Sequence, residues 1–253
     1  MAQSGVGKIR LFDDFCGPEF AVLNAVAIGT SAGGCNIAIG PFKITGDGLD
    51  DTYAGVASID DVVSGAVRLT TKAEDLHSTY IGTATCFNVA LMGTLILEAR
   101  VQMDALTARN VYIGFTSDND DQQQICCEAG GATTITLTED DLCGFLYNDE
   151  FTTDVDWHYI YKGGATTGET VSTSVDSGVT PVAAEWDVLR VEVDNNGTAR
   201  WFINGDLKKT LAGAMAVGTE YVAAVVGASA NAATVASVDV DYLLVGANRD
   251  WTR

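Results

Sequence analysis

Two segments near the end of the chain show the clearest alternation of apolar and polar residues. Residues 187–194 place an apolar residue at every second position, and a second apolar-rich segment, residues 199–204, follows the joint Asn195-Asn196-Gly197. A two-residue period puts the apolar side chains on one face of a strand. Asn and Gly tolerate positive φ and so favour a tight reversal. The pattern therefore predicts a β-hairpin.

The same alternation recurs along most of the chain. It is seen in residues 95–103, 111–115 and 235–245, and clusters of Gly, Asn, Asp, Ser and Thr separate the segments. No segment has a sustained apolar stripe with helical spacing, so we expect helix to be a minor component, with one turn near residues 138–142. This spacing of short strands is typical of an all-β sandwich. The predicted core of the two antiparallel sheets includes Leu189, Val191, Val193, Val238, Val240 and Tyr242.

Length and composition predict one domain. The chain has 253 residues, only three prolines and no charged or Pro/Ser-rich linker. We interpret residues 13–253 as a single sandwich and residues 1–12 as an N-terminal arm. Residues 20–42 carry no charge, but four glycines and several polar residues interrupt them, so they are expected to form strands and turns rather than a membrane span. The N-terminus has no signal-peptide apolar core, which indicates synthesis in the cytoplasm.

The charge balance limits the class of partner. With 34 acidic and 14 basic residues, the formal charge is −20. Nucleic-acid binding depends on Lys and Arg neutralising phosphates, so the sequence argues against nucleic acid and against anionic membranes as partners. We interpret the acidity as a means of keeping a self-associating surface soluble.

No catalytic residue is predicted. Ser31 lies in a G-x-S-x-G motif, but the following residues read as a strand rather than the helix that a nucleophile elbow needs. The acidic pairs, such as Asp140-Asp141, are adjacent residues at expected turns, so on a strand their side chains would point to opposite faces. The six cysteines form no C-x-x-C pair and are expected to be mostly reduced core residues. Disulfide formation is the alternative if the mature protein lies outside the cell.

Two further sets are candidates for binding. Oxygen ligands for Ca²⁺ could come from Asp118, Asp120 and Asp121, but this segment lacks the Gly and the distal Glu of an EF-hand loop. A plain turn is therefore the favoured interpretation, and no metal or other cofactor is expected. In residues 157–161, the aromatic side chains Trp157, Tyr159 and Tyr161 would share one face of a strand. Such a face packs in a core, fills a subunit interface or stacks on a sugar ring.

Several strand motifs together resemble a known family. The residues are Leu11-Phe-Asp-Asp-Phe15, residues 97–103 and 111–118, Leu189-Arg-Val-Glu-Val-Asp194, Arg200-Trp-Phe-Ile-Asn-Gly205 and Val238-Asp-Val-Asp-Tyr242. The chain thereby resembles the concanavalin A-like jelly-roll proteins of tailed bacteriophages, many of which are capsid decoration (cement) proteins. The resemblance covers residues 95–245 well and residues 1–94 poorly.

The resemblance implies a non-enzymatic protein on the virion surface. Its implied partners are the major capsid protein and further copies of itself, in a homo-oligomer for which a trimer is one form. Within the arm, Lys8 and Arg10 are the candidates for capsid contact, because few cations are available to meet a shell. Two alternatives stay open, namely a lectin-like module that binds a glycan or receptor, and a glycan hydrolase, which the missing E-x-D-x-x-E strand argues against.

Overall fold

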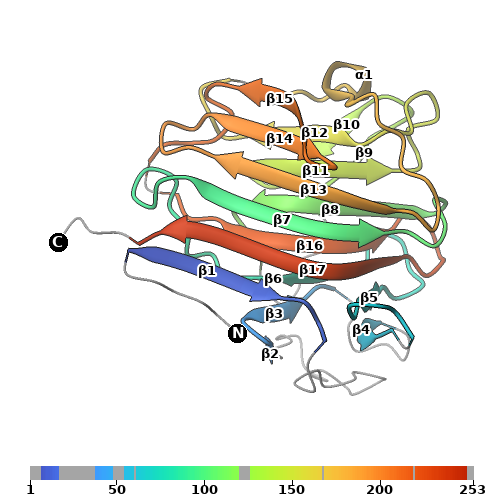
Figure 1. The fold of residues 1–253 in the computed structure, drawn as a ribbon. Coiled ribbons are helices and arrows are strands. Elements are labelled where there is room, and N and C mark those ends of the chain that lie inside the picture. Colours follow the sequence, from blue (N-terminus) through green and yellow to red (C-terminus); the bar gives the residue numbers. More distant parts are fainter. Residues whose placement is uncertain are drawn as a thin grey trace.

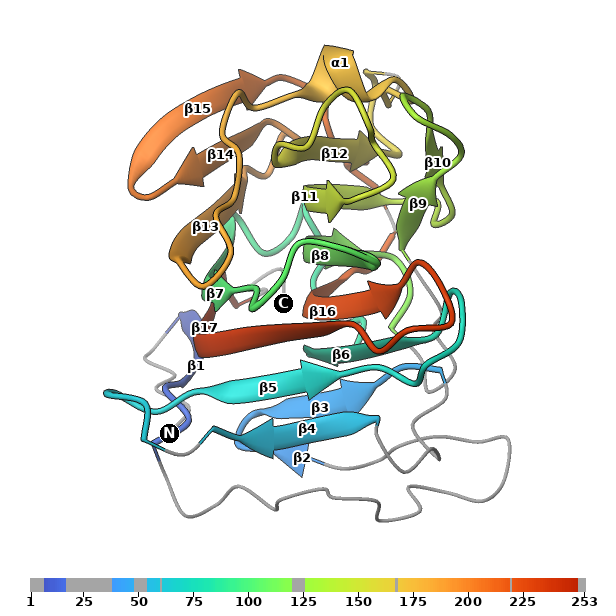
Figure 2. The same ribbon diagram turned by 90° about the vertical axis from the view of Figure 1, so that its right-hand side faces the viewer.

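The computed structural model of the protein describes residues 7–16, 38–47, 54–59, 61–119, 126–166, 168–218 and 220–249. These residues form two large antiparallel sheets that pack face to face (Figures 1 and 2). The helix found in the described ranges is one short turn, α1 (Ser172–Val175), rather than the expected turn at residues 138–142. The predicted all-β sandwich is therefore confirmed. None of the described helical segments has the length and apolarity needed to cross a membrane.

Sheet A contains the predicted hairpin. Its strand order is β15-β14-β13-β7-β17-β5-β4, and β1 pairs with the other end of β17. Within β7, buried residues alternate with half-buried ones, so one face meets the core and the other is partly open. The strands are β1 (Lys8–Asp13), β4 (Gly55–Ser58), β5 (Val67–Thr70), β7 (Leu95–Gln102), β13 (Trp186–Val193), β14 (Ala199–Ile203), β15 (Asp206–Leu211) and β17 (Ser237–Asn248).

Sheet B is covered on both faces. Its order is β12-β11-β8-β16-β6-β3-β2, and every residue of β6, β8, β11 and β16 is buried. A small hairpin of β9 (Cys127–Ala129) and β10 (Ile135–Leu137) lies beside β11, and α1 lies beside β12 (Figure 2). The strands are β2 (Ala38–Ile39), β3 (Phe42–Thr45), β6 (Ser78–Gly82), β8 (Arg109–Thr116), β11 (Leu142–Asn148), β12 (His158–Lys162) and β16 (Ala223–Ala230).

The predicted core is confirmed at five of its six positions. The buried members are Leu189, Val191, Val193, Val238 and Val240. Tyr242 is only partly buried, so that prediction is wrong. The register of β17 against β7 shifts between Val240 and Tyr242, which marks a β-bulge. The extra residue reverses the alternation, so that Leu243 and Val245 face the core instead.

The N-terminal arm needs a correction. Residues 8–13 form β1, whose register against β17 runs from Lys8 opposite Asn248 to Asp13 opposite Leu243. Ile9 and Leu11 pack against the core, while Lys8 and Arg10 are exposed. This segment therefore alternates like the other strands, and it closes one side of sheet A. Residues 1–6 lie outside the described ranges.

Candidate functional site

The aromatic face of β12 lies inside the sandwich. Trp157, Tyr159 and Tyr161 are at most 4% exposed. The rings of Tyr159 and Tyr161 lie 5.7 and 6.2 Å from that of Trp201 on sheet A, measured between centroids. Trp157 packs edge-on against Tyr147 and donates a hydrogen bond from Nε1 to Asp187 Oδ2 at 3.0 Å.

The contacts of these rings leave no room for a stacked sugar. Lys209 places its ammonium 5.3 Å and 5.5 Å from the ring centroids of Tyr159 and Tyr161. Trp201 is fully buried, and its Nε1 donates to the Gly144 carbonyl across the sandwich at 2.8 Å. The three aromatic side chains thus join the two sheets, and a sugar platform would require Trp201 and Lys209 to move.

The outer face of sheet A carries a row of ion pairs. Arg68 makes a bidentate contact with Asp239, with N···O distances of 2.6 and 2.8 Å. The remaining members of the row are Arg100 with Asp241, Arg190 with Glu98 and Glu192, and Arg200 with Glu192 and Asp194. Asp239 and Asp241 are buried, whereas the arginines stay partly exposed, so the pairs hold the side chains of this face in fixed positions.

A hollow of about 530 Å³ opens on the same face, over β1, β17 and β7. Its lining includes the apolar Ile96 and Leu244 and the backbone of Gly246. A Cβ built at Gly246 would meet Ile96 at 3.6 Å, an ordinary contact, so the hollow exists partly because this strand position has no side chain. A side chain added there would fill space rather than break the fold.

The rim of the hollow is cationic. Lys8, Arg10 and Arg190 line it, opposed by Glu98. Arg190 is paired with Glu98 and Glu192, but its Nε is buried without a hydrogen-bond partner. Lys8 donates only to the neutral Asn248 side chain, and no carboxylate of the described residues pairs with Arg10. Among the described residues, Lys8 and Arg10 are therefore cations without an ion-pair partner, in a chain whose net charge is −20.

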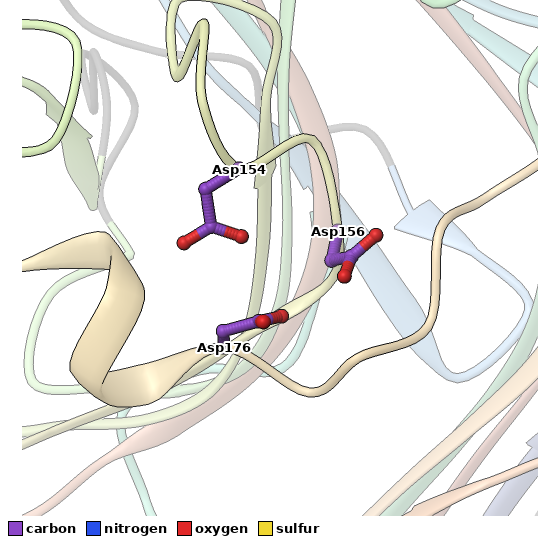
Figure 3. Close-up of side chains that lie close together, drawn as sticks. All are labelled: Asp154, Asp156 and Asp176. Carbon is purple, nitrogen blue, oxygen red and sulfur yellow. The ribbon is translucent and has the colours of Figure 1, made fainter.

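A second cluster was not anticipated from the sequence. Asp154, Asp156 and Asp176 each direct one carboxylate oxygen to a common point, with these oxygens within 4.8 Å of one another (Figure 3). Burial is the main cause that raises the pKa of Asp156; the Thr180 hydroxyl opposes this effect, and Asp176 adds to it. The short spacing of Asp154 and Asp156 was visible in the sequence, but nothing in it linked them to Asp176.

The other candidates are not brought together. Asp118 follows β8, whereas Asp120, Asp121 and the G-x-S-x-G residue Ser31 lie outside the described ranges. Asp140 is at an exposed turn, 3.8 Å from the ammonium of Lys162. No disulfide joins the described cysteines, of which Cys126, Cys127 and Cys143 are buried while Cys16 and Cys86 are exposed.

Comparison with known proteins identifies the fold alone. No protein-family model and no curated protein matches the sequence. A solved protein of unknown function, SO2946 from Shewanella oneidensis MR-1, matches 100% of this chain and 92% of its own, with 12% identity and a TM-score of 0.59. The Emp47p carbohydrate recognition domain matches 81% of this chain and 94% of its own, with 10% identity and a TM-score of 0.50.

A bacteriophage protein is similar to the same extent. The conserved carbohydrate esterase vb_24B_21 from Shiga toxin-encoding bacteriophage phi24B matches 83% of this chain and 91% of its own, with 16% identity and a TM-score of 0.50. Together with the two-sheet topology, these structures define the chain as a lectin-like jelly roll of the concanavalin A type. The fold predicted from the resemblance is confirmed, and function has to be argued from this chain's own surface.

Proposed function

We propose that the protein is a non-enzymatic surface protein of a tailed-bacteriophage virion, a capsid decoration protein that binds the shell through the outer face of sheet A. The observation that carries the proposal is the difference between the two sheets. The central strands of sheet B are covered by the chain itself, whereas sheet A presents a partly open, ordered face with a hollow. A broad face of fixed side chains suits attachment to another protein surface.

The positive charge at the rim of the hollow favours an acidic group on the partner. Lys8 and Arg10 stand at the rim beside an apolar floor that includes Ile96 and Leu244. An acidic side chain of the major capsid protein, carried on an apolar loop, would pair with Arg10 and bury the floor. Each Å² of apolar surface removed from water contributes about 25 cal/mol. Most of the remaining surface repels acidic partners, so the hollow would also fix the orientation of the bound protein.

Two supporting points come from outside the hollow. The strand motifs resemble those of phage decoration proteins, and a bacteriophage protein shares the fold.

Co-sedimentation with capsids of the phage that encodes the chain tests the proposal. We expect saturable binding of the wild-type protein and a loss of at least about tenfold for Arg10→Glu, because a partner carboxylate would then face a like charge. Gly246→Val should fill the hollow and weaken binding without unfolding the sheet. Lys162→Glu is the matched control, since it makes the same charge change on β12 of sheet B, away from the hollow.

The outcomes separate the alternatives. Wild-type protein that stays in the supernatant, or Arg10→Glu protein that binds as well as wild type, would contradict the proposal. Binding to host-cell glycans without binding to capsids would instead support the lectin-like alternative.

A further inference from the structure

The three-aspartate cluster beside β12 has an unusual charge balance. Among the described residues, no lysine or arginine forms an ion pair with Asp154, Asp156 or Asp176, although their carboxylates converge. Asp154 is buried, Asp156 is half-buried and Asp176 is exposed, so solvent screens this repulsion only in part. Convergence of like charges at such a place calls for a compensating positive charge.

Buried polar atoms beside the cluster provide independent evidence. His158 is completely buried, and neither of its ring nitrogens has a hydrogen-bond partner. Its Nε2 lies 3.3 Å from Asp154 Oδ2, in a contact that is not aligned as a hydrogen bond, and this oxygen is also buried without a hydrogen-bond partner. A buried polar group left without a partner costs about 1–3 kcal/mol. A cation bound in the cluster would supply a partner for the buried Asp154 carboxylate.

We propose that Asp154, Asp156 and Asp176 bind one calcium ion. Calcium takes six to eight oxygen ligands at about 2.3–2.6 Å, so two ligands on opposite sides of the ion are about 5 Å apart. The three oxygens, within 4.8 Å of one another, therefore fit in a single coordination shell. Water would complete the shell on the side of Asp176, which is open to solvent.

The chemistry of the ligands favours calcium over the alternatives. The site is built from hard carboxylate oxygens and lacks the cysteine ligands that select softer metals. Magnesium demands near-octahedral geometry and gives up its water reluctantly, whereas calcium accepts irregular sites. His158 Nε2 lies 3.3 Å from Asp154 Oδ2, so the imidazole would help to hold that carboxylate in position for the ion.

The ion would join two segments that are distant in the sequence. Asp154 and Asp156 precede β12, while Asp176 follows α1. The two segments already meet at a bridge between His158 and Asp176, and Asp176 Oδ1 accepts a hydrogen bond from the Gly178 amide at 2.7 Å. A calcium ion would fasten α1 against the edge strand of sheet B. This role is independent of the proposed capsid contact, which uses sheet A.

Thermal unfolding in calcium and in EDTA tests the site. We expect millimolar calcium chloride to raise the Tm of the wild-type protein by several degrees, because a ligand that binds only the folded state stabilises it. Asp156→Asn and Asp176→Asn should abolish this rise. In EDTA, the same variants should unfold at or above the wild-type Tm, since each removes a repelling charge. Asp140→Asn is the matched control, because Asp140 is a fully solvated carboxylate outside the cluster, and it should respond to calcium as wild type does.

Three results would overturn the inference. One is a wild-type Tm that calcium does not change. Another is an equal rise in the cluster variants, which would show adventitious binding to the acidic surface. The third is an equal rise with magnesium chloride at the same ionic strength. Calorimetric titration of the wild-type protein gives a direct check that does not depend on the variants, and we expect one calcium ion per chain, whereas no saturable heat would refute the site.

Discussion

Replacement of Trp201 by alanine tests how the two sheets are held together. Trp201 is fully buried on β14, contacts the rings of Tyr159 and Tyr161, and donates a hydrogen bond to the Gly144 carbonyl at 2.8 Å. Truncation of a buried tryptophan typically costs about 3–5 kcal/mol, because contacts are lost and a cavity remains. We therefore expect the free energy of unfolding of Trp201→Ala to fall by that amount, a large part of the stability of a typical domain.

Urea unfolding followed by far-UV circular dichroism measures this loss. Trp201→Phe keeps a large ring but removes the N–H donor, so it should lose about 1–3 kcal/mol. Trp186→Ala is the matched control, since Trp186 is only partly buried, at the start of β13, and stacks over the Arg100 guanidinium at 4.7 Å. That contact contributes about 0.5–1 kcal/mol at an exposed site. A loss below about 1 kcal/mol for Trp201→Ala, or an equal loss for Trp186→Ala, would refute the assigned packing.

Three further measurements examine separate features. Gly227→Ala should lower the free energy of unfolding by about 1–3 kcal/mol, because a Cβ there would lie 2.1 Å from the Tyr80 ring. Gly218→Ala is the control and should be neutral, since a Cβ at Gly218 meets nothing within 4 Å. Equal losses for the two variants would contradict this packing. Hydrogen bonds from Arg200 hold the pKa of Asp194 below its usual value. The wild-type protein should therefore be more stable than Arg200→Gln above about pH 4, and it should lose this advantage as the pH falls through the lowered pKa. Urea unfolding that shows the same difference in stability at pH 2 and pH 7 would contradict this role of Arg200. Among the described cysteines, the exposed Cys16 and Cys86 should react with a thiol reagent in the folded protein. Mass spectrometry should find the buried Cys126, Cys127 and Cys143 modified only after unfolding. Labelling of those three in the folded protein would show that the interior is more open.

Local alternation was enough to predict four strands of sheet A, namely β7, β13, β14 and β17. Leu189, Val191 and Val193 face the core as their two-residue period requires, and the Asn-Gly joint turns the chain. The period fails in β17, where Val238, Asp239, Val240 and Asp241 alternate and a bulge then inserts one extra residue before Tyr242. Nothing local marks that bulge, because either register leaves an apolar side chain facing the core.

The candidate sites depended more on tertiary structure. Lys8 and Arg10 were selected from the sequence for their charge, but their position beside a hollow follows from the pairing of β1 with β17 and from Gly246. The aromatic side chains of residues 157–161 do share a face, and only the packing of the sheets shows that Trp201 occupies it. Asp176 joins Asp154 and Asp156 through a bridge between distant segments, which no short-range pattern encodes.

An electron cryomicroscopy map of the virion that carries this protein would show directly whether the chain decorates the capsid. We expect density for the sandwich on the capsid shell, with the outer face of sheet A, including Arg10 and Gly246, against the capsid protein. The β9–β10 hairpin and α1, which lie beside β11 and β12 of sheet B, should face away from the shell. A shell without this density, or a sandwich that contacts the shell through sheet B, would refute the proposed capsid contact.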